Sequence, residues 1–138
     1  MSVNVKYRTN ATTSAGKIYT EDGHLSLLLS APKELGGTGG DGTNPEQLFA
    51  AGYSACFFAS IRFAGQQRNV KLPADASVTA NIGIGPGSDG SWRLVADLVV
   101  NLPGIDRREV EELIEAAHQI CPYSNSTRNN IEVGFNIV

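Results

Sequence analysis

The chain is poor in the residues that several classes of protein depend on. Among its 138 residues are only two cysteines and two histidines, and they show no Cys-x-x-Cys spacing of the kind found in zinc sites. Its 11 lysine and arginine residues are scattered and its net charge is -3, which argues against nucleic acid or an anionic membrane as a partner. No uninterrupted apolar run approaches the roughly 20 residues of a membrane-spanning helix. We therefore expect no resident metal ion, no nucleic acid partner and no membrane partner.

Signals for nucleotide cofactors and for export are also missing. There is no Gly-Lys-Ser/Thr phosphate loop. Gly37, Gly39 and Gly42 match a Gly-x-Gly-x-x-Gly fingerprint, but no parallel strand pattern with an acidic residue near its end follows the next helix, so we expect no cofactor. These glycines are more typical of a mobile lid or a plain spacer. Residues 1 to 7 lack the apolar core of a signal peptide, which predicts a cytoplasmic protein.

The apolar patterns that are present predict an α+β fold. A length of 138 residues suits one domain, so we expect a single domain over residues 1-138. We expect strands at Val3 to Tyr7, Lys17 to Thr20, Leu25 to Leu29, Val78 to Ile84, Trp92 to Leu102 and Ile131 to Ile137, and helices at Pro45 to about Gln67, Asp106 to about Ile120 and Tyr123 to Arg128. Strands and helices in this order indicate α+β rather than parallel α/β architecture.

The first long helix also bears on assembly. Its apolar residues, among them Phe49, Phe57, Phe58 and Ile61, leave almost no polar face. Two small sheets and one other helix offer little cover for such a segment, so a dimer that shares this helix is the natural solution. A monomer with a tightly folded core is the alternative.

The two cysteines have unequal surroundings. Cys56 lies in the middle of the apolar helix, where burial raises a thiol's pKa unless a cation or a hydrogen bond holds the thiolate. Cys121 shares a helical face with Val110 and therefore points toward the core. Pro122 is well placed as the first residue of a new short helix. The partial positive charge at the start of that helix would act on the Cys121 thiol. A redox pair and two unrelated core cysteines are both open, whereas a structural disulfide does not suit a reducing cytoplasm.

Two further residues are candidates for the site. His118 and Cys121 stand three apart on one helical side, so a metal site or a Cys-His pair is an alternative to a plain helix C-terminal histidine. Glu46 lies in the first turn of the long helix, where a carboxylate complements the helix dipole. Ten residues separate it from Cys56, about 15 Å along the axis. If Glu46 belongs to the site, it reaches the Cys56 of a partner subunit.

Two segments resemble the signatures of the Ohr/OsmC family. These are GTNPEQLFAAGYSACF, residues 42-57, and CPYSNSTRNNIEV, residues 121-133. The tyrosine in AGYSACF and the CPYS run resemble the organic hydroperoxide resistance (Ohr) branch. The resemblance implies an OsmC-like α+β fold with two antiparallel sheets around long central helices, in an intertwined homodimer.

The resemblance also implies an activity, that of a thiol peroxidase that reduces organic hydroperoxides to alcohols. Cys56 matches the family's peroxidatic cysteine, which becomes a sulfenic acid, and Cys121 matches the resolving cysteine that forms a disulfide with it. The implied reductant is a dithiol, either dihydrolipoamide or a lipoylated protein. The alternative is a non-catalytic member of the same fold that binds a small apolar ligand or senses oxidants; a metal-dependent hydrolase is a more distant one.

The chain departs from the family pattern at one position. Glu46 matches the family's site glutamate, whose usual partner is an arginine that stabilises the thiolate. Ser14 stands where that arginine is expected. Our hypothesis is that Lys17 or Arg8 supplies the missing charge, although an ammonium lacks the flat, bidentate geometry of a guanidinium.

Overall fold

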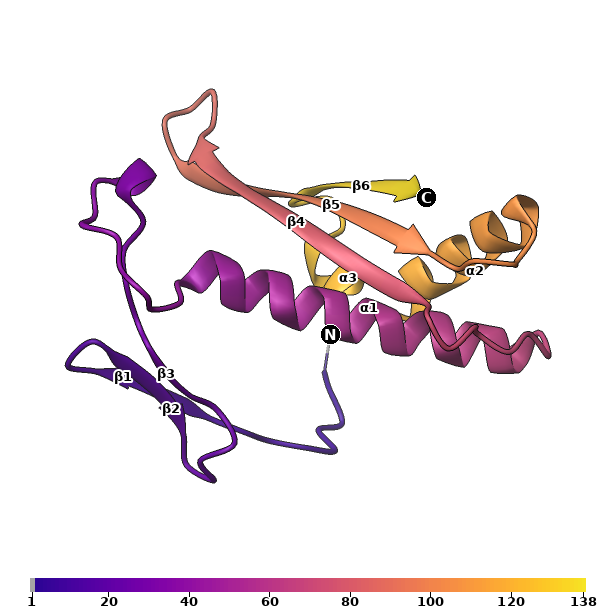
Figure 1. Cartoon of the computed structure of the whole chain (residues 1–138), viewed down its shortest axis with the longest axis horizontal. Coiled ribbons are helices and arrows are strands. Elements are labelled where there is room, and N and C mark those ends of the chain that lie inside the picture. Colours follow the sequence, from indigo (N-terminus) through magenta and orange to yellow (C-terminus); the bar gives the residue numbers. More distant parts are fainter. Residues whose placement is uncertain (1) are drawn as a thin grey trace. The chain divides into compact units, whose positions relative to one another are not determined.

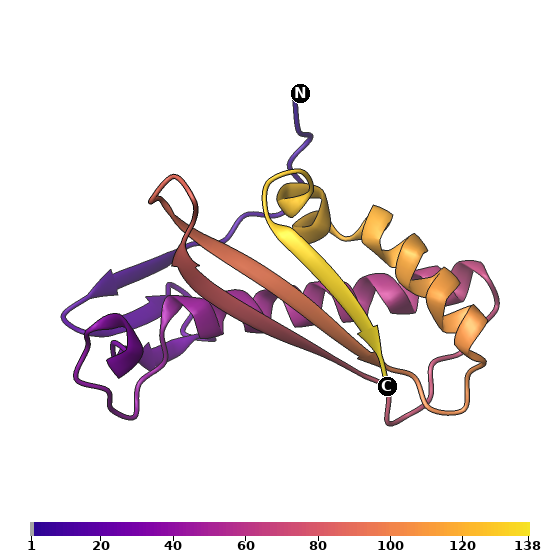
Figure 2. The ribbon, with the colours of Figure 1, turned by 90° about the horizontal axis from the view of Figure 1, so that it is seen from above.

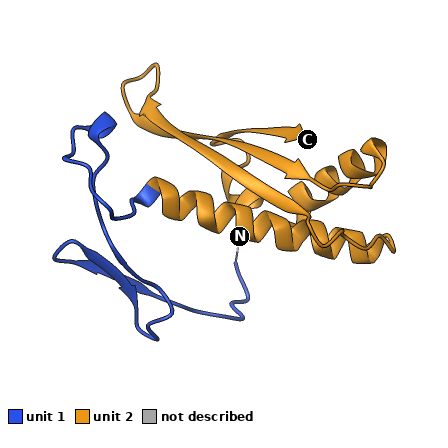
Figure 3. Cartoon of the chain, viewed as in Figure 1, with its two compact units in different colours: residues 1–45 blue, residues 46–138 orange. Residues whose placement is uncertain are grey.

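The structure, a computed structural model, describes residues 2-138 and divides the chain into two compact units. The first comprises residues 1-45 and the second residues 46-138 (Figure 3). Each unit has its own three-stranded sheet. The expected single domain over residues 1-138 stays a prediction.

The first unit is built on a small antiparallel sheet. Its strands are β1 (Ala11–Ser14), β2 (Lys17–Thr20) and β3 (Ser26–Leu28), in the order β1-β2-β3. Ala15 and Gly16 join β1 to β2 with φ angles of 52° and 75°, the two positive values that a type I′ hairpin turn requires. A 3-10 helix, η1 (Lys33–Leu35), follows β3.

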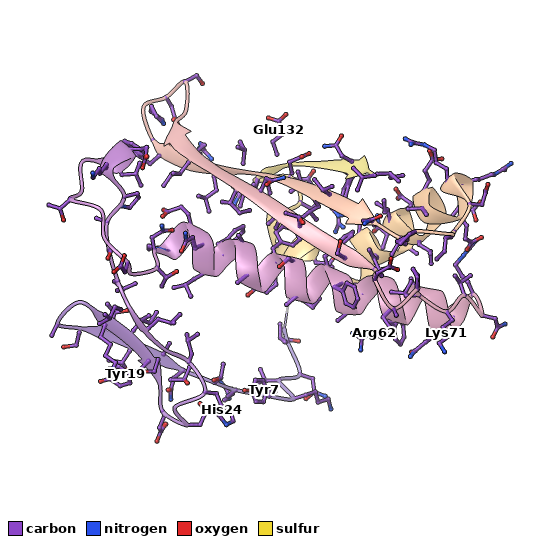
Figure 4. All side chains as sticks on the ribbon, in the orientation of Figure 1. Tyr7, Tyr19, His24, Arg62, Lys71 and Glu132 are labelled. Carbon is purple, nitrogen blue, oxygen red and sulfur yellow. The ribbon has the colours of Figure 1, made fainter. Side chains whose placement is uncertain are left out.

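The strand predicted from Val3 to Tyr7 is wrong. Residues 2-10 form no strand, and β1 begins at Ala11. Val3 and Tyr7 are 76% and 78% exposed, and Figure 4 shows Tyr7 with Tyr19 and His24 in this unit. A strand exists through hydrogen bonds to a neighbour. The alternating pattern is present, but this unit offers it no strand to pair with.

Hydrogen bonds hold the glycine-rich segment from residue 36 to 42 against the chain that precedes it. The Gly39 N–H donates to the Ala31 carbonyl (2.9 Å), and the Gly42 N–H donates to the Ser30 hydroxyl (2.8 Å). A Cβ at Gly37 would lie 2.3 Å from the Ala31 carbonyl oxygen. The segment therefore packs closely on residues 30-31.

The second unit consists of a mixed sheet with helices on one face. After α1 (Pro45–Gln67) come β4 (Ser77–Pro86), β5 (Trp92–Asn101), α2 (Arg107–Ile120), α3 (Pro122–Thr127) and β6 (Glu132–Ile137). The sheet has the order β4-β5-β6 and lies over α1, with α2 and α3 beside that helix (Figures 1 and 2). The predicted bounds of α1 and α2 are confirmed.

The second sheet corrects one expectation. The β4-β5 hairpin is antiparallel, as expected, but β6 pairs with β5 in parallel. The chain reaches β6 through α2 and α3, and a crossover of this kind returns a strand in the same direction as its neighbour. The α+β class is confirmed, although only the first sheet is wholly antiparallel.

The core forms where α1, β5 and α2 meet. Alternate residues of β5 are buried, as expected for a strand with one covered face. The inward face of α2 follows helical spacing. The buried apolar residues are Tyr53, Phe57, Ile61, Ala64, Ala96, Leu98, Val100, Leu102, Val110, Leu113, Ile114, Ala117 and Cys121. They fix α1 against the part of the chain that carries the second cysteine.

Local signals account for the position of α2. Asp106 caps the helix, and its carboxylate accepts a hydrogen bond from the Arg108 N–H (3.2 Å). Arg68, just after α1, pairs with Glu109 (2.7 Å) and Glu112 on α2. These pairs are open to solvent, which screens them, so they add little to stability. Apolar packing therefore determines how the two helices meet.

Helix α1 meets the length and composition criteria for a membrane span. This differs from the sequence expectation because mean hydropathy over a helix tolerates isolated polar residues. The core helix of a soluble protein meets the same criteria. In this unit Tyr53, Phe57 and Ile61 of α1 are fully buried in the core, so its apolar character has a structural explanation.

Candidate functional site

The fold brings the two cysteines together. Cys56 on α1 and Cys121 at the start of α3 are 65 residues apart in sequence, and their Sγ atoms lie 3.4 Å apart, with the Cys121 thiol donating. Both are free thiols; Cys121 is fully buried and Cys56 is half-buried. Two sulfur atoms at this distance need only a modest approach to form an S–S bond of about 2.05 Å.

Cys121 occupies the junction between two helices. It is the C-cap of α2 and the N-cap of α3. Its N–H donates to the Ala117 carbonyl (2.8 Å), and its carbonyl accepts from the Asn125 N–H (2.9 Å). Pro122 is the first residue of α3, a position where its missing N–H has no cost. The predicted core-facing cysteine and the short helix after it are both confirmed.

The surroundings of Cys56 raise its pKa above the ordinary value of 9.0. Burial is the largest cause, and the thiol of Cys121 adds to it. A hydrogen bond from the backbone of Tyr123, in the first turn of α3, acts in the opposite direction because it stabilises the thiolate. The net effect favours the thiol, so rapid nucleophilic chemistry at Cys56 needs a further stabilising charge.

Three buried hydroxyl groups connect α1 to α3. The Tyr53 hydroxyl lies 2.8 Å from the Ser124 hydroxyl and 3.3 Å from that of Thr127. All three residues are at most 3% exposed. From the sequence, Tyr53 and the CPYS run were recognised only as signs of a family branch. Polar residues three apart on the core side of α3 were the signal that could have revealed the contact.

Aromatic rings also pack where α1 meets α3. The rings of Phe49, Tyr53 and Tyr123 lie with centroids 5.7 to 6.1 Å apart. Gly52 makes room for this packing, because a Cβ at that position would lie 2.5 Å from the Tyr123 hydroxyl oxygen. The candidate site therefore has apolar, aromatic surroundings on the side of α1 that precedes Cys56.

The remaining predicted site residues are not brought to Cys56 by helix α1. Glu46 is half-buried in the first turn of α1, and α1 is continuous from Pro45 to Gln67. Ten residues of helix therefore put Glu46 about 15 Å from Cys56 along the axis. Ser14 and Lys17 are paired across the β1-β2 turn and are exposed, as is Arg8. The role of Lys17 or Arg8 as the missing cation stays a prediction.

Arg128, a cation within the second signature segment, is engaged elsewhere. It donates to the Asn125 side chain (2.7 Å) and to the His118 carbonyl (2.6 Å). His118 packs edge-on against Phe135, with ring centroids 5.0 Å apart. Burial, and then the charge of Arg128, lower the pKa of His118. Within residues 2-138, no group of three or more His, Cys, Asp and Glu residues is placed to hold a metal ion.

An open groove lies on another side of α1. It has a volume of about 610 Å³, and its lining includes Phe58, Arg62, Lys71 and Leu72. Figure 4 labels Arg62 and Lys71. The Arg62 guanidinium carbon lies 5.2 Å from the centre of the Phe58 ring. Phe58 is two residues from Cys56, which turns it about 200° around the helix. The groove is therefore not part of the cysteine site.

Comparison with known proteins identifies the family. The model of the OsmC family, OsmC-like protein, matches residues 37–136. The chain is 47% identical over 132 residues to the organic hydroperoxide resistance protein of Xanthomonas axonopodis pv. citri, covering 94% of this chain and 92% of that protein. The crystal structure of an organic hydroperoxide resistance protein from Elizabethkingia anophelis matches with a TM-score of 0.91 at 40% identity, covering 98% of both chains. A putative one from Vibrio cholerae, with captopril in one of its active sites, matches with a TM-score of 0.87 at 44% identity, covering 99% of this chain and 94% of that chain. The chain therefore belongs to the OsmC family, in its organic hydroperoxide resistance branch.

Proposed function

We propose that the protein is a thiol-dependent peroxidase that reduces organic hydroperoxides to alcohols. The observation that carries this proposal is the contact of Cys56 and Cys121, whose Sγ atoms lie 3.4 Å apart. The aromatic surroundings suit a substrate with an apolar tail. Relatives over most of the chain's length are named organic hydroperoxide resistance proteins, which supports the same substrate class.

The proposed reaction uses the two cysteines in sequence. The Cys56 thiolate attacks the terminal oxygen of a hydroperoxide, the O–O bond breaks, and the leaving alkoxide takes a proton to become an alcohol. Cys56 is thereby oxidised to a sulfenic acid. The Cys121 sulfur then attacks the Cys56 sulfur, an S–S bond forms, and hydroxide leaves with a proton as water. Each hydroperoxide thus consumes two thiols and yields one disulfide.

Regeneration requires two electrons and two protons from another dithiol. Thiol–disulfide exchange with dihydrolipoamide or a lipoylated protein supplies both, and the reductant leaves as a cyclic disulfide. A dithiol suits this step because its second thiol completes the exchange within one molecule. The cytoplasm, where such reductants are regenerated, is the proposed location.

We propose a homodimer as the working form. Helix α1 has apolar residues away from its core face, including Phe63, which is 49% exposed. Glu46 lies too far along its own helix to reach its own Cys56, so in a dimer it would act at the Cys56 of the partner subunit. Lys17 or Arg8 would supply the cation that stabilises the thiolate.

A steady-state assay tests the proposed function. Consumption of cumene hydroperoxide is compared with that of hydrogen peroxide, with dihydrolipoamide as reductant, for the unmodified protein, Cys56→Ser and Cys121→Ser. We expect faster turnover of the organic peroxide, complete loss in Cys56→Ser, and loss of repeated turnover in Cys121→Ser. A folded protein that turns over neither peroxide but binds an apolar ligand would support the non-catalytic alternative.

A further inference from the structure

We propose that Tyr53 is a positioning residue whose hydroxyl, through Ser124 and Thr127, holds helix α3 so that its first turn faces the Cys56 sulfur. This inference rests on the proposed function, because it assigns Tyr53 a part in preparing the reactive thiol. It adds to that proposal a residue whose hydroxyl acts through helix α3.

The hydroxyl groups of Tyr53, Ser124 and Thr127 meet in the interior of the protein. Tyr53 and Ser124 are fully buried and Thr127 is 3% exposed, so water does not compete for their hydroxyl groups. The Tyr53 oxygen lies 2.8 Å from Ser124 and 3.3 Å from Thr127, and Thr127 also donates to the Ser124 carbonyl (3.2 Å). A buried hydroxyl without a partner costs about 1-3 kcal/mol. The contact therefore favours one placement of α3 against α1.

Helix α3 depends on its neighbours for its position. This helix has only six residues, Pro122–Thr127, and isolated helices so short are unstable in water. Its position must come from contacts with its neighbours. Toward α1 it is held by the Tyr53 hydroxyl and by the Tyr123 backbone bond to Cys56. At its end, Arg128 donates to the His118 carbonyl of α2 (2.6 Å). The Tyr53 hydroxyl is therefore one of the few polar contacts that can set the position of α3 against α1.

The placement of α3 against α1 also affects the Cys56 thiol. The first turn of α3 contains the Tyr123 backbone group that hydrogen-bonds to Cys56, and Cys121 stands immediately before it. Hydrogen bonds to a charged group weaken steeply with poor geometry. Ser124 directly follows Tyr123, so a shift of Ser124 moves this donor. Without the Tyr53 hydroxyl, α3 relaxes away from α1, and both the Tyr123 bond and the sulfur contact loosen.

Peptide-resolved alkylation of the reduced protein tests the proposal. The rate of Cys56 modification by iodoacetamide is measured against pH for Tyr53→Phe and Ser124→Ala. The midpoint of this pH profile reports the pKa of Cys56. We expect it to rise by about one pH unit, which corresponds to a tenfold loss of thiolate at neutral pH. The matched control is Ser126→Ala, which removes an exposed hydroxyl from the same helix. It should leave the midpoint unchanged.

Combination and rescue variants separate positioning from general stability. If the hydroxyl groups act as one unit, Tyr53→Phe with Ser124→Ala shifts the midpoint no further than either change alone. Thr127→Val should raise it less, because its contact is longer, and Thr127→Ser should restore it. The threonine pair also serves as the test if Tyr53→Phe does not fold. A variant that melts earlier but keeps the Cys56 midpoint would overturn the proposal.

The readout also distinguishes this inference from the proposed function, because alkylation requires no peroxide. A shifted midpoint in a protein without peroxidase turnover would retain the positioning role and reject the enzyme. Normal turnover together with an unshifted midpoint in both the tyrosine and threonine variants would reject the positioning role alone.

Discussion

The two units of the chain differ in what they bury. Residues 46-138 contain every buried residue of the described chain, including the contact between the two cysteines, whereas residues 2-45 contain none. The second unit buries an apolar core, although it also exposes apolar residues such as Phe63 (49%) and Val95 (50%). The first exposes apolar residues such as Tyr7 (78%) and Leu28 (65%). The candidate thiols therefore lie in a unit that has a buried core, and the candidate cations Lys17 and Arg8 lie in one that has no buried residue.

A pair of leucine substitutions gives the largest expected contrast. Leu113→Ala, at a fully buried position in the second unit, should lower the free energy of unfolding by about 2-5 kcal/mol through lost burial and a cavity. Leu28→Ala in the first unit should change it by about 0.5 kcal/mol or less if its surface stays exposed. Urea titration measures both. A large loss at Leu28, dependent on protein concentration, would show that a second chain covers the first unit.

A glycine substitution tests the packing beside the cysteines. Gly52→Ala would place a Cβ 2.5 Å from the Tyr123 hydroxyl oxygen, so the ring must move, at a cost of about 1-3 kcal/mol. Gly85→Ala is the control, because nothing lies within 4 Å of its Cβ position. Thermal unfolding compares the two. Equal stability of both variants would mean that Tyr123 is not held against α1.

The cation hypothesis gives a residue of the first unit a role in the chemistry of Cys56. If Lys17 or Arg8 stabilises the Cys56 thiolate, neutralising that residue to glutamine should raise the pKa of Cys56 by about one unit and slow peroxide reduction. Lys6→Gln, another exposed cation of the first unit, is the control. The pH dependence of alkylation gives the answer. The hypothesis is wrong if neither variant differs from the unmodified protein.

Protonation of His118 gives the smallest expected effect. Its pKa is lowered below 6.5 in the folded protein, so the unfolded chain binds more protons as the pH falls below about 6.5. The free energy of unfolding should therefore fall from that pH downward and level off below the folded pKa. His118→Gln should reduce the slope of the free energy of unfolding against pH. His24→Gln in the first unit is the matched control. Denaturant titrations between pH 7 and 5 measure it; an unchanged slope in His118→Gln would contradict the assignment.

The sequence predicted the helices well because their signals are local. Pro45 and Asp106 mark helix starts, and the spacing of Val110, Leu113 and Ala117 identifies the inward face of α2. Alternation along a strand carries no information about direction, so the parallel pairing of β6 was missed. The pattern from Val3 to Tyr7 was present, but whether it becomes a strand depends on a neighbour.

The candidate site was predictable only in part. The surroundings of Cys56 and Cys121 left a redox pair and two unrelated core cysteines open, and family resemblance favoured the pair, since a separation of 65 residues gives no local signal. The Tyr53 contact with Ser124 and Thr127 was missed because it depends on the rotation of α3 against α1. A tertiary contact between two helices sets that rotation, and neither helix encodes it alone.

The separation of the two cysteines has a consequence for the oxidised protein. A bond between residues 65 positions apart would enclose the whole β4-β5 hairpin and helix α2 in one covalent ring. Such a ring removes conformational freedom from the denatured chain, which by loop-closure entropy corresponds to about 4 kcal/mol. Heat resistance should thus report the redox state of the protein, with the oxidised form melting later than the reduced one.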